Sequence, residues 1–266
     1  MKEKKYLIDT TLRDGEQSPG FAFNMDEKVK LALLMDRAGM HQIEAGIPAM
    51  GKYEKDTICK IMSNRRRARI STWNRMNKGD LQHSFDCCPD IIHISAPVSY
   101  VHIYSKLKKN KVWLQKNLQE CVEMTLEKGY IVTVGFEDAS RADITFIIGI
   151  ANLLKDMGVA SIRFADTVGV LTPSRAYQSI KEIISNTGIS MGIHAHNDFG
   201  MAVANSLEAA KAGAEFIDTT LFGIGERAGN CDLNQFIAAT EQIFDIRPSR
   251  ADANVLKQKA EEILFK

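Results

Sequence analysis

Cysteine is scarce in this chain, and its placement excludes two common uses of the residue. The cysteines are odd in number and form no C-x-x-C pair. A disulfide framework and a zinc knuckle are therefore not expected, and we interpret the thiols as reduced. The five residues are Cys59, Cys87, Cys88, Cys121 and Cys231.

Long apolar runs and a strong excess of one charge are also missing. The longest apolar run, at 144–154, is shorter than the ~18 residues of a membrane helix, so we expect a buried helix there and no membrane partner. A net charge of +1 over 266 residues argues against a general nucleic-acid binder. The basic N-terminus is not followed by an apolar stretch, so we expect no secretory signal and a cytoplasmic location.

No repeat, linker or low-complexity segment divides the chain; short β-rich segments instead alternate with segments of helical period. Eight such βα units in about 250 residues favour a closed (β/α)₈ barrel with a parallel sheet. An open doubly wound sheet would need a Gly-rich phosphate loop after the first strand, and "TLRDGEQSPG" is not one. The predicted strands are at 6–12, 42–48, 68–73, 91–97, 130–136, 161–167, 190–196 and 215–223.

Capping residues delimit two of the predicted helices. Asn24 is placed to begin one and Gly39 to end it, while Thr172 and Gly188 bracket another. We predict a single catalytic domain over 1–266. Residues 244–266 are expected to form a short helical tail outside the barrel.

Polar residues gather where the predicted strands end. In a (β/α)₈ barrel the active site lies at the C-terminal ends of the strands, so these residues are the candidates for chemistry. In chain order they are Arg13, Asp14, Gln17, Glu44, His93, Ser95, Glu137, Asp138, Asp166, Thr167, His194, His196 and Asn230.

The segment "GIHAHNDFG" places two histidines one residue apart on a predicted strand. His194 and His196 then share one face, because side chains alternate along a strand. Asp14 follows the first strand, which neighbours the eighth in a closed barrel, and the seventh lies one further round. With the Asn230 amide this is a mixed nitrogen and oxygen set that suits Mg²⁺, Mn²⁺, Fe²⁺ or Zn²⁺. Arg13 beside it can stabilise a developing oxyanion.

Ordinary structural roles compete with each of these interpretations. An H-x-H pair also occurs as a plain surface or core pair, and Arg13 and Asp14 can simply pair with each other. The glycines of "GIGERAGN" can do no more than make a turn. We interpret His41, His83 and His102 as non-functional.

Two long motifs resemble the signatures of one enzyme family. "LRDGEQSPGFAFNMDEK" (12–28) resembles the first signature of the 2-isopropylmalate and homocitrate synthases, and "MGIHAHNDFGMAVA" (191–204) matches their second. "FEDASRAD", "FADTVGVLTP" and "GIGERAGN" follow in the expected order. Within this family of DRE-TIM metallolyases, "EAGIPAMG", "RFADTVGVL" and "HISAPVS" most resemble homocitrate synthases of the nitrogen-fixation type.

The resemblance implies a divalent metal cation and two substrates. Asp14, His194 and His196 would bind the metal, with Asn230 as a nearby or weaker ligand. The implied reaction is a Claisen-type condensation of acetyl-CoA with a 2-oxo acid, followed by thioester hydrolysis. With 2-oxoglutarate as the oxo acid, the products are homocitrate and CoA.

Further roles carry over to other polar residues. Arg13 would polarise the keto oxygen and stabilise the alkoxide, and Thr167 would bind the carboxylate of the oxo acid. Gln17 and His93 would complete the substrate site. Glu137 would position or deprotonate the acetyl group.

Two departures from the family pattern leave alternatives open. Lysine-pathway homocitrate synthases place an Arg on the fifth strand to hold the distal carboxylate, and Thr133 stands at that position here. Citramalate, isopropylmalate and Re-type citrate synthases therefore remain alternatives.

The helical subdomains that follow the barrel in full-length members, with their candidate His base and Tyr partner, have no equivalent before Lys266. We expect either Glu137 with water or a second chain to supply that function, as in the two-chain enzymes of some nitrogen-fixing clostridia; a homodimer is the other expected assembly.

Two other classes of function are alternatives. Acyl-CoA lyases of the same metal barrel group place a catalytic Cys before the Asn ligand, whereas Cys231 here follows Asn230. The remaining alternative is a non-catalytic regulatory barrel subunit, which has no need for a complete set of metal ligands.

Overall fold

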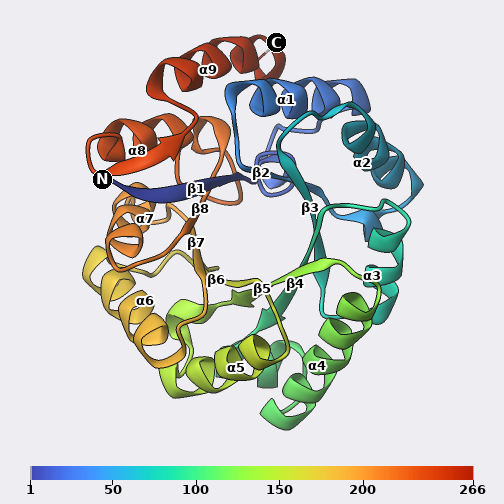
Figure 1. The fold of residues 1–266 in the computed structure, drawn as a ribbon, viewed down its shortest axis with the longest axis vertical. Coiled ribbons are helices and arrows are strands. Elements are labelled where there is room, and N and C mark those ends of the chain that lie inside the picture. The colour runs from blue at the N-terminus through green and yellow to red at the C-terminus, as the bar shows by residue number, and fades with distance from the viewer. Residues whose placement is uncertain (1, 266) are drawn as a thin grey trace.

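Eight parallel strands close into a ring, and helices surround it (Figure 1). The computed structural model describes residues 2–265. Each strand pairs with the next along the chain, and β1 pairs with both β8 and β2, which closes the ring. The predicted (β/α)₈ barrel is confirmed. The strands of the ring are β1 Glu3–Asp9, β2 Gln42–Gly46, β3 Arg69–Arg75, β4 Ile91–Pro97, β5 Ile131–Glu137, β6 Ser161–Asp166, β7 Met191–Ala195 and β8 Phe216–Thr219.

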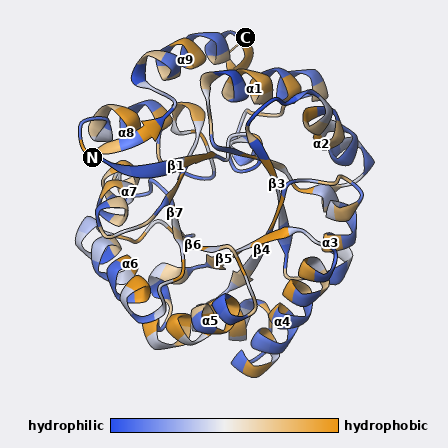
Figure 2. Ribbon diagram, in the orientation of Figure 1, coloured by the Kyte–Doolittle hydropathy of each residue, from blue (hydrophilic) through white to orange (hydrophobic). Residues whose placement is uncertain are grey.

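The helices lie outside the strands, and one follows each strand of the ring. Figure 2 shows hydrophobic and hydrophilic residues interspersed along these helices. In α5 the buried positions are Ile147, Ile150, Ala151 and Leu154, which recur at helical spacing and face the core. The helices are α1 Met25–Ala38, α2 Lys52–Asn64, α3 Lys78–Phe85, α4 Lys111–Glu127, α5 Ile144–Asp156, α6 Pro173–Thr187, α7 Ala202–Lys211, α8 Leu233–Thr240 and α9 Arg250–Leu264.

The predicted helix boundaries are confirmed for α1 and α6, with one difference in capping. Asn24 and Glu27 form a reciprocal capping box at the start of α1, and Gly39 ends it with a φ of 92°. Gly188 likewise ends α6. Thr172 begins α6 without a side-chain capping hydrogen bond.

The first strand lies three residues earlier than predicted, at Glu3–Asp9 instead of 6–12. The chain turns immediately afterwards, because the Thr11 N–H donates to the Asp9 carboxylate (2.8 Å) and the Asp14 N–H donates to the Thr10 carbonyl (2.8 Å). Asp14 therefore lies in the loop after β1, where it begins the 3₁₀ helix η1 (Gly15–Gln17).

The C-terminal segment is not wholly helical, so that expectation was wrong for its first residues. A ninth strand, β9 (Phe244–Arg247), pairs in parallel with the beginning of β1, in register from Glu3 to Tyr6. β9 lies on the edge of β1 opposite β8, where β2 pairs only with Ile8 and Asp9, so β9 covers the part of that edge that β2 leaves open. α9 follows and packs beside α1 and α8 (Figure 1). Over residues 2–265, no helix combines the length and apolar character needed to cross a membrane.

Candidate active site

A cavity of about 350 Å³ opens at the C-terminal ends of the strands. Most of the predicted site residues line it: Arg13, Asp14, Gln17, His93, Ser95, Glu137, Thr167, His194 and His196. The candidates that do not line it are Glu44, Asp138, Asp166 and Asn230. The lining residues that the sequence did not single out are Ile47, Trp73, His102, Lys106, Gly135, Arg163, Ala165, Val168, Glu226 and Arg227.

Asp14, His194 and His196 converge on one point. A ligand atom from each lies within 4.8 Å of the other two, and all three side chains are buried. The Nε2 atoms of His194 and His196 lie 2.8 and 3.5 Å from Asp14 Oδ2. The prediction that alternation along the seventh strand directs both imidazoles to one place agrees with this geometry.

The other ring nitrogen of each histidine has a fixed partner. His194 Nδ1 lies 2.9 Å from Asp218 Oδ2, and His196 Nδ1 lies 3.0 Å from the Asp166 carbonyl oxygen. A partner that accepts at Nδ1 keeps a proton on that atom, so Nε2 is the atom that turns toward Asp14 and would bind a metal ion. This is the arrangement that orients imidazoles toward a metal ion.

The donor atoms of the four predicted ligands suit a divalent cation. His196 Nε2 and Asn230 Oδ1 are buried and have no hydrogen-bond partner, a costly condition unless a ligand satisfies them. The backbone of Asn230 bridges to that of His196, and the Asn230 Nδ2 group donates to the Ile224 carbonyl, which leaves Oδ1 available. Two imidazoles, a carboxylate and an amide oxygen suit the first-row and alkaline-earth ions predicted from the sequence.

The glycine loop that carries Asn230 is shaped by close backbone approaches. A Cβ on Gly225 would lie 1.9 Å from Asn230 Nδ2, and a Cβ on Gly229 would lie 2.0 Å from the Gly223 carbonyl oxygen. Only glycine fits at either place. The glycines therefore make the turn and also hold the Asn230 side chain.

Charges around the metal ligands favour an ionised carboxylate. Burial alone would raise the pKa of Asp14, but Arg13 and the two histidines outweigh it and hold that pKa well below its ordinary value. Burial alone would lower the pKa of His194, but its hydrogen bonds to Asp14 and Asp218 raise that pKa to about 9.

Four side chains form a chain of buried ion pairs beneath this point. Arg13 Nε lies 2.6 Å from one Glu44 oxygen, and Arg163 Nη1 lies 2.9 Å from the other. Arg163 Nε lies 2.9 Å from Asp218 Oδ2, the oxygen that also contacts His194. Burial would raise the pKa of Glu44, but Arg163 and Arg13 hold it far below its ordinary value. Arg13 and the predicted metal ligand His194 are thus fixed by one connected network.

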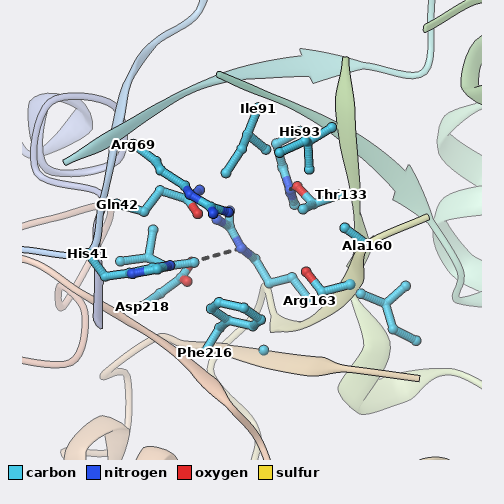
Figure 3. A pocket seen from close by; sticks show the side chains of 15 residues that line it. His41, Gln42, Arg69, Ile91, His93, Thr133, Ala160, Arg163, Phe216 and Asp218 are labelled. Atoms are coloured by element: carbon cyan, nitrogen blue, oxygen red, sulfur yellow. Dashed lines mark hydrogen bonds and ion pairs between the residues drawn. The ribbon is translucent and has the colours of Figure 1, made fainter. Parts of the chain in front are cut away.

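Figure 3 shows the deeper part of the barrel interior, where Arg163 extends toward Asp218. A pocket of about 50 Å³ lies there, lined partly by the first residues of β4, β5 and β6. Arg163 and His93 line both this pocket and the larger cavity, so they form the floor between the two. Arg163 and Asp218 were not among the predicted site residues, although both are charged residues in the middle of buried strands.

His93 is a neutral residue of this floor. Burial, with the nearby Arg163 guanidinium, holds its pKa well below its ordinary value. Its Nδ1 lies 2.8 Å from Thr133 Oγ1. A Cβ on Gly135 would lie 2.5 Å from His93 Nε2, so the glycine makes room for the ring.

Glu137 lies at the mouth of the cavity with two partners from the segment after β4. His102 Nδ1 lies 2.9 Å and Lys106 Nζ 2.7 Å from Glu137 Oε1. His102, which the sequence led us to interpret as non-functional, therefore lines the cavity beside Glu137. It belongs to the π-helical segment η3 (Val101–Lys106), whose turn after β4 brings the ring back over the mouth.

The rest of the rim holds Gln17 and Thr167 in place. The Gln17 amide nitrogen lies 3.1 Å from Asp14 Oδ1 and 3.0 Å from Glu226 Oε1. Thr167 Oγ1 accepts a hydrogen bond from the Asp138 N–H (2.8 Å).

Cys231, next to Asn230, is fully buried. Burial raises the pKa of its thiol to about 12. Such a thiol is protonated at neutral pH and is not a nucleophile.

Comparison with known proteins places the chain in a family. The HMGL-like family matches residues 4–259. The chain is 45% identical to the homocitrate synthase subunit alpha of Clostridium pasteurianum, over 97% of this chain and 96% of that protein. It is 43% identical to 2-isopropylmalate synthase 2 of Caldanaerobacter subterraneus, over 90% of this chain but only 62% of that protein.

The fold has a solved counterpart. The crystal structure of the HMG-CoA lyase from Bacillus subtilis superposes with a TM-score of 0.87 at 16% identity, covering 99% of this chain and 95% of that one. The chain belongs to the HMGL-like family and, within it, to the acyltransferase enzymes of the homocitrate synthase group.

Proposed function

We propose that this chain condenses acetyl-CoA with 2-oxoglutarate, in the presence of a divalent metal ion, to give homocitrate and CoA. The observation that carries the proposal is the convergence of Asp14, His194 and His196 beside Arg13 at the barrel mouth. The similarity to a protein named homocitrate synthase subunit alpha supports this choice of oxo acid among those used in the family.

Arg13 is held ready to stabilise negative charge. Glu44 and Asp14 occupy only part of its five N–H donors, and the side chain lines the cavity, so the remaining donors can reach a keto oxygen there. A metal ion bound by Asp14 and the histidines would supply Lewis acidity at the same oxygen. The Thr167 hydroxyl accepts from a backbone N–H, and its own hydrogen remains to bind a carboxylate.

Glu137 is the chain's own candidate for the proton transfer. Its carboxylate would take a proton from the acetyl methyl group, whose carbon then attacks the keto carbon of the oxo acid. The electron pair of the keto C=O bond moves to its oxygen, which takes up a proton from the protonated Glu137 or from water to become a hydroxyl. Water then cleaves the thioester to a carboxylate and the free CoA thiol. His102 and Lys106 fix the position of Glu137.

A second chain is part of the proposal. The relative from Clostridium is named as a subunit, and the 2-isopropylmalate synthase 2 from Caldanaerobacter, of which the match covers 62%, is longer than this chain. We propose that a partner subunit supplies the remaining catalytic groups and that the barrel alone turns over slowly.

The test is release of free CoA thiol from acetyl-CoA by the purified chain, with Mn²⁺ or Mg²⁺, with and without a candidate partner. 2-Oxoglutarate is compared with pyruvate, 2-oxoisovalerate and oxaloacetate. Fastest release with 2-oxoglutarate, and loss of it in His196→Ala, would support the proposal. Preference for another oxo acid would reassign the substrate, and full turnover without a partner would refute the two-chain arrangement. Formation of acetyl-CoA from hydroxymethylglutaryl-CoA would instead indicate a lyase.

A further inference from the structure

Five arginines of this chain have no side-chain partner. Most of its thirteen arginines donate to a carboxylate or to a carbonyl oxygen, as Arg65 does to Asp90 and Arg175 does to the Ser140 carbonyl. Within residues 2–265, the guanidinium groups that have no hydrogen bond or ion pair are those of Arg37, Arg66, Arg67, Arg69 and Arg247. All five residues are exposed, and the chain itself does not neutralise their charge.

Three of them belong to the run "RRRAR" (65–69), whose place in the fold is fixed by other groups. The Asp36 carboxylate accepts hydrogen bonds from the N–H groups of residues 66, 67 and 68, and Arg65 pairs with Asp90. The backbone therefore holds this loop between α2 and β3, and the unpaired guanidinium groups add no contact to the fold. Because neighbouring like charges repel each other, their presence together favours an anionic ligand.

One groove of about 710 Å³ is lined by three of the unpaired arginines, Arg37, Arg67 and Arg247. The groove lies at the N-terminal ends of β1 and β2, at the end of the barrel opposite the active site, and it shares no lining residue with the active-site cavity. Lys4 also lines the groove and makes no ion pair with any of residues 2–265. Asp245 and Asp252 are the lining carboxylates, so the unpaired cations outnumber them.

Arg69 extends this positive surface to the small pocket in the barrel interior. His41 lines both the groove and that pocket, and Figure 3 shows Arg69, Gln42 and His41 along one side of the pocket. Burial, together with the charges of Arg69 and Lys4, lowers the pKa of His41. The two cations therefore act on the same part of the groove, although they come from different strands.

We propose that this groove binds a small molecule that carries two or more phosphate groups. Its volume lies in the range of small-molecule sites, which are about 300 to 1,000 Å³. The planar guanidinium group presents paired N–H donors that match phosphate oxygens, and it stays charged at physiological pH. The inference goes beyond the proposed function and does not depend on it, because the groove and the active-site cavity have separate linings.

The first experiment measures binding of inorganic pyrophosphate to the full chain by calorimetry, without a divalent metal and at about 0.15 M KCl, where weak surface attraction is screened. The double variant Arg67→Gln/Arg247→Gln should raise the Kd about tenfold or more, since it removes two charge-assisted contacts. Both residues are exposed, so the variant should fold normally.

The matched control is Lys108→Gln/Lys109→Gln. It also removes two exposed charges that have no ion pair within residues 2–265, but these lysines follow β4 at the opposite end of the barrel. The control should leave the Kd for pyrophosphate unchanged. An equal loss of affinity in both double variants would mean that only the total charge matters, and would overturn the site.

A second pair of measurements tests the chemistry of recognition. Arg67→Lys/Arg247→Lys keeps both charges but removes the paired donors, so it should recover only part of the affinity that the glutamine variant loses. Citrate, which carries carboxylates in place of phosphates, should bind wild type at least tenfold more weakly than pyrophosphate. Citrate that binds as tightly as pyrophosphate would overturn the assignment to phosphate.

Two further outcomes decide the proposal. Wild-type protein that binds no pyrophosphate would overturn it, and so would a glutamine variant that keeps the wild-type Kd. Neither result bears on the proposed function, which is tested separately by release of the CoA thiol. The glutamine variant should keep the wild-type kcat and KM in that assay when pyrophosphate is absent.

Discussion

Buried polar groups at the mouth of the barrel lack partners, whereas those in the interior below it are paired. At the mouth, His196 Nε2 and Asn230 Oδ1 have no hydrogen-bond partner, and Asp14 sits between two imidazoles. Below, Arg163 is paired on both sides, with Glu44 and Asp218. One region is incomplete without a ligand, and the other satisfies most of its charge internally.

This contrast assigns different roles to residues of similar chemistry. A buried polar group without a partner costs free energy, so such groups collect where a ligand will complete them. A buried pair of charges contributes little net stability but fixes geometry. We infer that the ion pairs of the interior position Arg13 and His194, while the polar groups at the mouth bind the ligand.

Removing a ligand at the mouth should have the largest effect. We expect His196→Ala to lower affinity for Mn²⁺ and turnover about a thousandfold or more, because one imidazole donor is lost and the others cannot move to replace it. Calorimetry with Mn²⁺ and the thiol-release assay measure the two effects. His83→Ala, an exposed histidine on α3, is the matched control and should change neither. Equal Mn²⁺ affinity in both variants would contradict the metal centre.

Breaking the interior pairs should act on stability. Arg163→Met removes the cation that Glu44 and Asp218 share, so both carboxylates stay buried without it. This variant should lower the free energy of unfolding by about 3 to 5 kcal/mol. Urea unfolding measures it. Adding Glu44→Gln and Asp218→Asn to Arg163→Met should recover part of the loss, because no uncompensated charge then remains. A single variant as stable as wild type would show that the network is not buried as described.

Asp218 links the two regions, since it contacts both Arg163 and His194. Asp218→Asn should weaken Mn²⁺ binding about tenfold to a hundredfold, the usual effect of losing the partner of a ligating histidine. The control is Asp36→Asn, which removes a buried carboxylate that accepts three backbone N–H groups far from the metal ligands. Asp36→Asn should reduce stability and leave Mn²⁺ affinity unchanged. Equal losses of affinity in both variants would mean that the effect is only general destabilisation.

The sequence was sufficient for the parts of the molecule that depend on periodic patterns. The alternation of short and long segments predicted the barrel, and spacing by two residues predicted that His194 and His196 act together. The ninth strand was missed because four residues, with β1 as their only strand neighbour, leave no recognisable pattern. The shift of β1 arose from the turn that Asp9 and Thr11 make, which depends on one side-chain hydrogen bond.

The missed site residues were of two kinds. Arg163 and Asp218 stand at inward positions of buried strands, and a charged residue there was a usable signal, because an unpaired charge is not stable in a barrel interior. The position of His102 carried no such signal. It depends on the π-helical turn after β4, which no local pattern specifies.

Asp9 is the exception within the interior, and its predicted effect is a dependence of stability on pH. Burial raises its pKa to about 7 despite hydrogen bonds from Thr11, and one of its oxygens has no partner. The unfolded chain has the ordinary value of 3.8, so the folded state holds an extra proton between these values and its stability falls as pH rises through them. Between pH 5 and 8 wild type should lose about 2 to 3 kcal/mol relative to Asp9→Asn. Urea unfolding at both pH values measures this.

Asp36→Asn is again the control. Burial would raise the pKa of Asp36, but three backbone hydrogen bonds lower it. The difference in free energy of unfolding between Asp36→Asn and wild type should therefore be constant over this range. A constant difference for Asp9→Asn as well would mean that Asp9 is ionised throughout, and that a cation or water in the interior compensates it.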